Sequence, residues 1–474
     1  MLKKIAGAWE TVIRQPPGRG GPVPQVLSAL PVIVTAIWWL ICFGFYISGW
    51  PIQYNRGNAG LVALLLGSTL VLVIAVFLFV VRRKPIERQA PSEKEASKLP
   101  WIMIAAVVAI VALYGPLAET YSGYRFWEVL PALADQAKAY ELAGLRISEG
   151  LGSRLGLVFI QTALSPITLA VVPFLALRWF ESRRSLLPLI VVLALSVFTS
   201  VLGGRDFQLV LSAILVACAW IVSRVRRGTG FRWRDLVVLG GGGLVGIFLF
   251  GLRKQSRMSD QPYCPEGADI CAIPGAPTLW DTVTVTVSSY FSQGFEGLGR
   301  ALDASWSFGG GYSHSPALVS LVDTFVGVEN NDVVTAQLDE LDWSATANWS
   351  TGFAMIANDV PWVLVPLVVA VGALLLALAW RATITLGDWL SVSVFAYSFI
   401  GLFFMPMNLQ LTISGPLYLG YLCLVALFVT RMIGSRFFPG FTFRISRWSI
   451  AGRPVFGLAP ADTLPIEEGA RSLS

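Results

Sequence analysis

The stretch LVALLLGSTLVLVIAVFLFVV, residues 61–81, contains no charged side chain and ends directly at Arg82, Arg83 and Lys84. A helix needs about 20 consecutive apolar residues to cross the hydrocarbon core of a bilayer, because each residue advances it by about 1.5 Å. This stretch is long enough. Residues 61–81 are therefore predicted to form a membrane-spanning helix.

The composition of the whole chain agrees with a membrane protein. Of its 474 residues, 55% are hydrophobic and 14% are charged, whereas soluble domains carry about 25% charged residues. The 17 Trp residues suit a chain that crosses membrane–water boundaries. A cleaved signal peptide is not expected, because a Pro/Gly-rich stretch leads into a full-length apolar run without a small-residue cleavage pattern.

Ten apolar runs are long enough, or nearly long enough, to span a bilayer. They predict an all-α polytopic integral membrane protein of about 10 transmembrane helices. The runs lie near 26–48, 61–81, 101–118, 157–177, 186–203, 207–222, 236–252, 361–380, 389–407 and 411–430.

The basic residues predict the orientation of these spans. With a cytoplasmic N-terminus, the inner segments contain 25 of the 35 basic residues, although the outer segments are longer. Lys and Arg are enriched in cytoplasmic loops. We therefore expect a multi-pass protein of the cytoplasmic (inner) membrane with both termini cytoplasmic. The net charge of +6 follows this topology, so no nucleic-acid partner is expected.

This topology divides the chain into five parts. A cytoplasmic N-terminal segment (1–25) precedes helices 1–7 (26–252), which include an outer loop at 119–156. A large extracytoplasmic loop domain (253–360) lies between helices 7 and 8. Helices 8–10 (361–430) and a cytoplasmic tail (431–474) complete the chain.

The loop domain contains the only two cysteines outside the predicted spans, Cys264 and Cys271. A close pair on the oxidising side favours a disulfide, and two free thiols are the alternative. Because the chain has a single histidine and no CxxC pair, no metal site is predicted.

Some basic residues lie on the outer side, against the inside bias. Arg205 follows two glycines in a tight turn between two spans, where pairing with Asp206 is the simplest alternative role. Arg253, Lys254 and Arg257 emerge directly from the seventh span. Guanidinium groups match phosphate oxygens in a bidentate way and stay charged. These residues are predicted to hold a lipid pyrophosphate, with stop-transfer charge as the alternative.

Residues 290–300, YFSQGFEGLGR, mix aromatic, polar and glycine residues, beginning at Tyr290 and ending at Arg300. Aromatic faces beside polar groups suit carbohydrate rings, and packing of an interfacial helix is the alternative. The preceding alternation of Val283, Val285 and Val287 with polar residues is typical of a strand or of a half-buried helix.

Three outer residues are candidates for a general base: His314, Glu296 and Asp359. An imidazole has the ordinary pKa suited to proton transfer near neutrality. A carboxylate needs a raised pKa for this role, which a site at the membrane edge supplies. The alternative for His314 is an ordinary residue of a Gly/Ser-rich loop.

The chain has an outward Gly-Gly-Arg turn, a basic cytoplasmic loop, a span ending in basic residues and a Tyr-Phe-x-x-Gly-Phe-x-x-Leu segment at 290–298. This order resembles the bacterial oligosaccharide repeat-unit polymerases (Wzy-type, the O-antigen polymerase group). Residues 351–359 are similar to that family's Thr…Asp-x-Gly region, with Val360-Pro361 in place of the aromatic residue and glycine. The resemblance covers roughly residues 119–430.

The resemblance implies a GT-C-like membrane glycosyltransferase that takes an oligosaccharide repeat from undecaprenyl pyrophosphate and adds it to a second lipid-linked repeat. It implies no metal, nucleotide or other cofactor, and allows a chain-length-regulating co-polymerase as a partner beside membrane lipids. Arg205, Arg253, Lys254 and Arg257 would then hold the donor pyrophosphate. Arg125 and Arg146 would hold the second pyrophosphate or line the glycan groove.

Three other functions are alternatives to this interpretation. A metal-dependent lipid-phosphosugar transferase is disfavoured, because the first outer loop (49–60) carries only Arg56 as a charged residue. An O-antigen ligase has the same outer basic site and differs only in its acceptor. A lipid-linked-oligosaccharide flippase or other transporter usually has ionisable residues within its spans, and these spans are almost free of them.

Overall fold

The computed structural model describes residues 22–54, 56–83, 86, 100–148, 155–204, 206–229, 231, 233–255, 268–271, 278–327, 332–344 and 348–437. Within this part the chain is nearly all helical. Eight helices are long and apolar enough to cross a membrane, which confirms a polytopic membrane protein. They are α3 (Leu30–Ser48), α4 (Ala59–Arg82), α6 (Trp101–Ser122), α9 (Leu155–Ser182), α11 (Phe207–Arg227), α12 (Trp233–Gln255), α16 (Val365–Thr385) and α18 (Gly415–Phe437).

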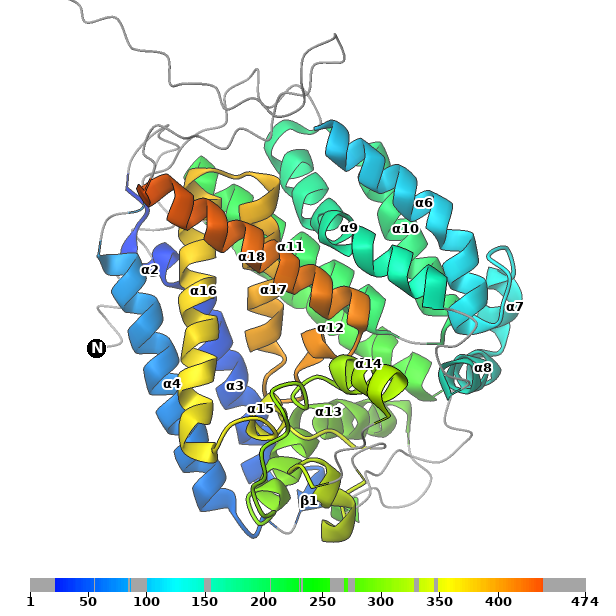
Figure 1. Ribbon diagram of the computed structural model, residues 1–474, viewed down its shortest axis with the longest axis vertical. Coiled ribbons are helices and arrows are strands. Elements are labelled where there is room, and N and C mark those ends of the chain that lie inside the picture. Colours follow the sequence, from blue (N-terminus) through cyan, green and yellow to red (C-terminus); the bar gives the residue numbers. More distant parts are fainter. Residues whose placement is uncertain are drawn as a thin grey trace, which may run out of the picture.

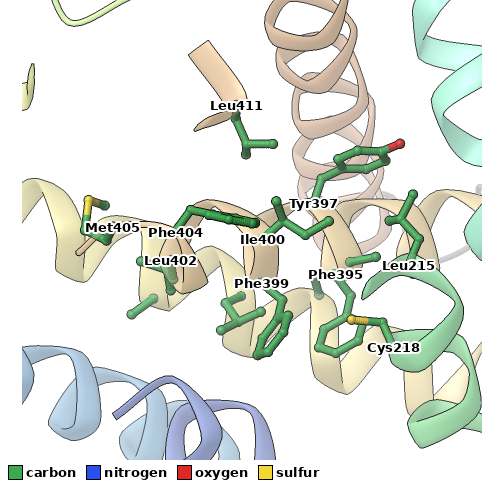
Figure 2. Close-up of a cluster of buried hydrophobic side chains, with 14 of the residues drawn as sticks. Leu215, Cys218, Phe395, Tyr397, Phe399, Ile400, Leu402, Phe404, Met405 and Leu411 are labelled. Atoms are coloured by element: carbon green, nitrogen blue, oxygen red, sulfur yellow. The ribbon is translucent and has the colours of Figure 1, made fainter. Parts of the chain in front are cut away.

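Two further predicted spans form shorter apolar helices, α10 (Leu186–Leu202) and α17 (Trp389–Phe403). Helix α17 contacts α3, α9, α11, α16 and α18, and nearly all its residues are buried. A helix that is apolar on all sides suits such a position. Figure 2 shows its Phe395 beside Cys218 and Leu215 of α11. The count of ten spans stays a prediction.

The helices form one bundle in which neighbours in space are often distant in sequence (Figure 1). Helix α4 packs along α16, and α9 packs along α18, α11, α6 and α17. At one end of the bundle, buried Arg226 donates to Glu181 at 2.7 Å and to the carbonyls of Thr383 and Ile384, each at 2.9 Å. These bonds join α9, α11 and the end of α16.

Most of the remaining elements gather at the opposite end, which we name the loop end (Figure 1). There, β1 (Ile52–Tyr54) pairs antiparallel with β2 (Ala268–Cys271), with Ile52 opposite Cys271. The other elements at this end are α7 (Val129–Ala134), α8 (Gln136–Ser148), α13 (Leu279–Ala301), α14 (Pro316–Val326), η2 (Ala336–Leu341), α15 (Gly352–Ala357), η3 (Trp362–Leu364) and η4 (Gln410–Thr412). A one-turn helix, α2 (Gln25–Ser28), precedes α3.

Of the two structures predicted for residues 283–287, the helix is confirmed: they belong to α13. Thr278 and Asp281 begin this helix with a capping box. Phe291 and Phe295 pack edge-on against Trp38 and Phe43 of α3, with ring centroids 4.8 and 5.4 Å apart. These contacts bury the aromatic side of α13 in the bundle.

Candidate functional site

The central feature of the loop end is a pair formed by His314 and Asp359. The Nδ1 atom of His314 lies 2.6 Å from Oδ2 of Asp359, which also accepts from the backbone N–H of His314 at 2.8 Å. The Asp359 side chain is 8% exposed and that of His314 is 21% exposed. The carboxylate is thus shielded, while the imidazole stays accessible. Two of the three predicted candidates for a general base therefore lie in direct contact.

The loop before His314 wraps around the carboxylate. Oδ1 of Asp359 accepts from the backbone N–H groups of Gly311 at 2.9 Å and Ser313 at 3.2 Å. Gly310 and Gly311 have φ angles of 78° and 82°, which side-chain-bearing residues rarely adopt. The Gly-rich sequence therefore lets three backbone N–H groups of one short loop, those of Gly311, Ser313 and His314, point at one carboxylate.

Asn358 holds the other side of this loop. Its amide nitrogen donates to the Ser313 carbonyl at 2.9 Å, and its own carbonyl accepts from Gly309 N–H at 2.7 Å. A Cβ atom on Gly309 would lie 2.4 Å from that carbonyl, so a larger residue does not fit. The Asn358-Asp359 dipeptide thus binds the 309–314 loop through both side chains.

The electrostatics of Asp359 favour the ionised form. Burial raises its pKa, but the hydrogen bonds from the His314 ring and backbone, with that from Ser313, outweigh burial and hold the pKa below its usual value. When an ionised Asp359 accepts the Nδ1 proton of His314, Nε2 is the ring nitrogen that can act as an acceptor. The pair is arranged for His314 to accept a proton at Nε2.

Tyr418 of α18 completes the network, because its hydroxyl lies 2.5 Å from Nε2 of His314. The sequence did not single out this residue, which lies inside the predicted span 411–430. Beside it, Ser315 donates to the Thr412 carbonyl at 2.9 Å and so joins the start of α14 to η4, which shortly precedes α18. The one feature of the sequence that could have pointed to Tyr418 is a tyrosine near the start of a predicted span.

The third candidate, Glu296, lies in a different place. Its Oε1 accepts from Nε of Arg300 at 2.9 Å, and Arg300 also donates to the carbonyls of Leu341 and Asp342. Glu296 and Arg300 line a polar pocket of about 310 Å³ together with Asn58. Glu296 is 3% exposed, and its carboxylate is engaged by a neighbouring guanidinium.

Arg253 is bound within the bundle. Its guanidinium contacts Asp206 at 2.9 Å, Gln136 at 2.9 Å, and both the hydroxyl and the carbonyl of Ser200, at 3.1 and 2.6 Å. Its charge is therefore compensated by Asp206, and its N–H groups join α8, α10 and α12. Within the described part of the chain, the ion pair with Asp206 is thus a salt bridge of a residue predicted to bind phosphate.

The remaining predicted residues are dispersed or fall outside the described part. Arg205, Arg257 and Cys264 lie outside the described residues; of Lys254 and Cys271 only the backbone is described. Arg125 is exposed, with its guanidinium 5.4 Å from the ring of Trp127, and Arg146 is exposed on α8. Tyr290 packs between Phe250 and Trp349, with centroids 5.0 and 4.5 Å away.

The chemistry open to this end of the bundle is proton transfer by an oriented imidazole. Within the described ranges, no group of three or more His, Cys, Asp or Glu side chains is arranged to hold a metal ion. Comparisons with known proteins found no match among family models, curated proteins or solved structures.

Proposed function

We propose that this chain is a membrane glycosyltransferase that polymerises undecaprenyl-pyrophosphate-linked oligosaccharide repeats at the outer side of the cytoplasmic membrane. The observation that carries the proposal is the His314–Asp359 pair, held at 2.6 Å with the imidazole accessible. A histidine whose other nitrogen is oriented by a buried carboxylate is arranged as a general base.

The position of the pair suits a substrate that is half lipid and half sugar. Asp359 lies shortly before Trp362, where a membrane-spanning helix begins, and Tyr418 lies in the first turn of α18. The lipid part of such a substrate then stays in the bilayer while its pyrophosphate and sugars reach His314.

The proposed step transfers one glycan and one proton. The acceptor hydroxyl takes the place of the Tyr418 hydroxyl at Nε2 of His314 and loses its proton to that nitrogen. Its oxygen forms a bond to the anomeric carbon of the donor glycan as the bond from that carbon to the phosphate oxygen breaks. Polyprenyl pyrophosphate leaves with the electron pair, and Asp359 stabilises the imidazolium.

The leaving pyrophosphate needs positive charge nearby. Because Arg253 is neutralised by Asp206, the proposal assigns this role to Arg205, Lys254 and Arg257 and gives Arg253 the task of holding α8, α10 and α12 together. The second substrate supplies the acceptor hydroxyl, so no further co-reactant is required.

The test uses the purified full-length protein with a fluorescent polyprenyl-pyrophosphate oligosaccharide. A ladder of products on a gel is the expected result, and His314→Ala is expected to remove it. Transfer to a different acceptor without a ladder would replace polymerisation by a ligase activity. Movement of the intact lipid across vesicles without any transfer would overturn the proposal in favour of transport.

A further inference from the structure

A groove runs along the bundle surface between α9 and α18. Its volume is about 570 Å³, and none of its lining side chains is charged. The α9 side is formed by Phe159, Ala163 and Pro166, and the α18 side by Leu419, Leu422 and Ala426. Phe159 and Leu422 are 74% and 41% exposed, so the groove opens outward from the bundle.

The groove exists because the two helices approach closely on one side of it. A Cβ atom on Gly420 would lie 2.4 Å from Oγ of Ser165, so the backbone of α18 rests against α9 at this position. Small Ala163 and Ala426 leave space beside this contact. The space is open to whatever surrounds two membrane-spanning helices, which is hydrocarbon.

The depth of the groove restricts it to one leaflet. Phe159 and Pro166 lie four and eleven residues from the start of α9 at Leu155, which is about 6 and about 16 Å at 1.5 Å per residue. Half of a bilayer core is about 15 Å thick. The groove therefore covers the half of the membrane that adjoins the loop end.

The groove begins on α18 one residue along the chain from a contact of the His314 site. Its first lining residue on α18, Leu419, directly follows Tyr418, whose hydroxyl contacts His314. The groove is therefore within reach, along α18, of the chain of a lipid whose headgroup lies at His314. An ordinary membrane lipid whose chain filled the groove would likewise have its headgroup near His314.

We propose that the groove between α9 and α18 binds the hydrocarbon chain of the lipid-linked donor and thereby sets the position of its headgroup at His314. This inference rests on the proposed function for the identity of the lipid, and on the groove itself for the binding. It assigns the chain-binding role to Ala163, Leu419, Leu422 and Ala426.

The direct test is photo-crosslinking of the full-length protein by geranylgeranyl diphosphate that carries a terminal diazirine. Crosslinked peptides are expected from α9 and α18, and Ala426→Phe, which fills the groove, should reduce them at least five-fold. Ala63→Phe is the matched control, because Ala63 is exposed on α4 outside the groove. Excess unlabelled geranylgeranyl diphosphate should compete, whereas excess phosphatidylglycerol should not.

A kinetic measurement separates this inference from the proposed function. With active protein, Ala426→Phe should raise KM for a long-chain donor at least ten-fold and leave kcat unchanged. Groove-specific crosslinks without any glycosyl transfer would support the groove and refute the transferase. Equal crosslinking of all lipid-facing helices, with normal KM in Ala426→Phe, would overturn the groove while the transferase stands.

Discussion

Replacing Asp359 by Asn changes one oxygen to an amide nitrogen in a site that offers four hydrogen-bond donors. The carboxylate accepts from the backbone of Gly311, Ser313 and His314 and from the His314 ring. An asparagine oxygen serves either the first two or the last two donors. Whichever way it is turned, its NH2 group meets N–H groups that need an acceptor.

The change should affect both the free energy of unfolding and the turnover. A hydrogen bond to a charged group contributes about 1.5–3 kcal/mol, so losing the acceptor for one pair of donors should lower the free energy of unfolding by about 3–6 kcal/mol. The asparagine also removes the charge that stabilises an imidazolium and the acceptor that keeps the proton on Nδ1. Turnover should fall by about 10²- to 10⁴-fold, the range that general-base catalysis supplies.

The assay measures product ladders and the thermal midpoint of the same purified samples. Asp323→Asn is the matched control, because Asp323 is an exposed carboxylate on α14 close in sequence to His314. It should keep both turnover and stability. The reasoning is refuted if the Asp359→Asn protein folds with a normal midpoint and polymerises at the wild-type rate.

The pH dependence of stability gives a further check on Asp359. Its pKa in the folded protein lies below the usual value, so folding favours the carboxylate. This contribution is present above the ordinary carboxyl pKa and is lost as the pH falls through the lower folded pKa. The difference in thermal midpoint between wild type and Asp359→Asn should therefore narrow below a pH of about 4.

Three other substitutions test the remaining assignments. Arg226→Ala leaves the buried carboxylate of Glu181 without its cation and should destabilise the protein by about 3–5 kcal/mol, seen as a lower midpoint in thermal unfolding. Gly294→Ala places a Cβ atom 2.2 Å from the Pro406 carbonyl, and this overpacking should cost about 1–3 kcal/mol in the same measurement. Glu296→Gln should weaken the contact with Arg300 but leave turnover of the folded protein unchanged, because the proposed base is His314, which bonds to Asp359. A loss of kcat without a loss of stability would instead indicate that Glu296 is the general base.

Part of the candidate site was accessible from residue type and position alone. A single histidine in a predicted outer loop and an acid directly before a span were sufficient to select His314 and Asp359. Their pairing across 45 residues was not predictable, because it depends on how the Gly309–Ser313 loop and α15 pack together. Tyr418, 104 residues from His314, was hidden within an apolar run.

The basic residues predicted to hold a pyrophosphate also show that tertiary contacts cannot be read from sequence. Position relative to the spans predicts that Arg253 is an outer basic residue. Only the packing of α8, α10 and α12 brings Asp206, Gln136 and Ser200 around its guanidinium. A charge can be counted in a sequence, whereas its compensation is a property of tertiary contacts.

By itself, the sequence determined that this chain forms membrane-spanning helices and approximately where each one lies. In lipid, a long apolar segment has no other partner for its backbone than itself, so local composition is sufficient. Only the tertiary structure decided that α17 lies in the centre of the bundle, that Glu296 and His314 belong to separate sites and that Asp359 orients the imidazole. Those outcomes depend on side-chain packing between segments far apart in the chain, which no local pattern encodes.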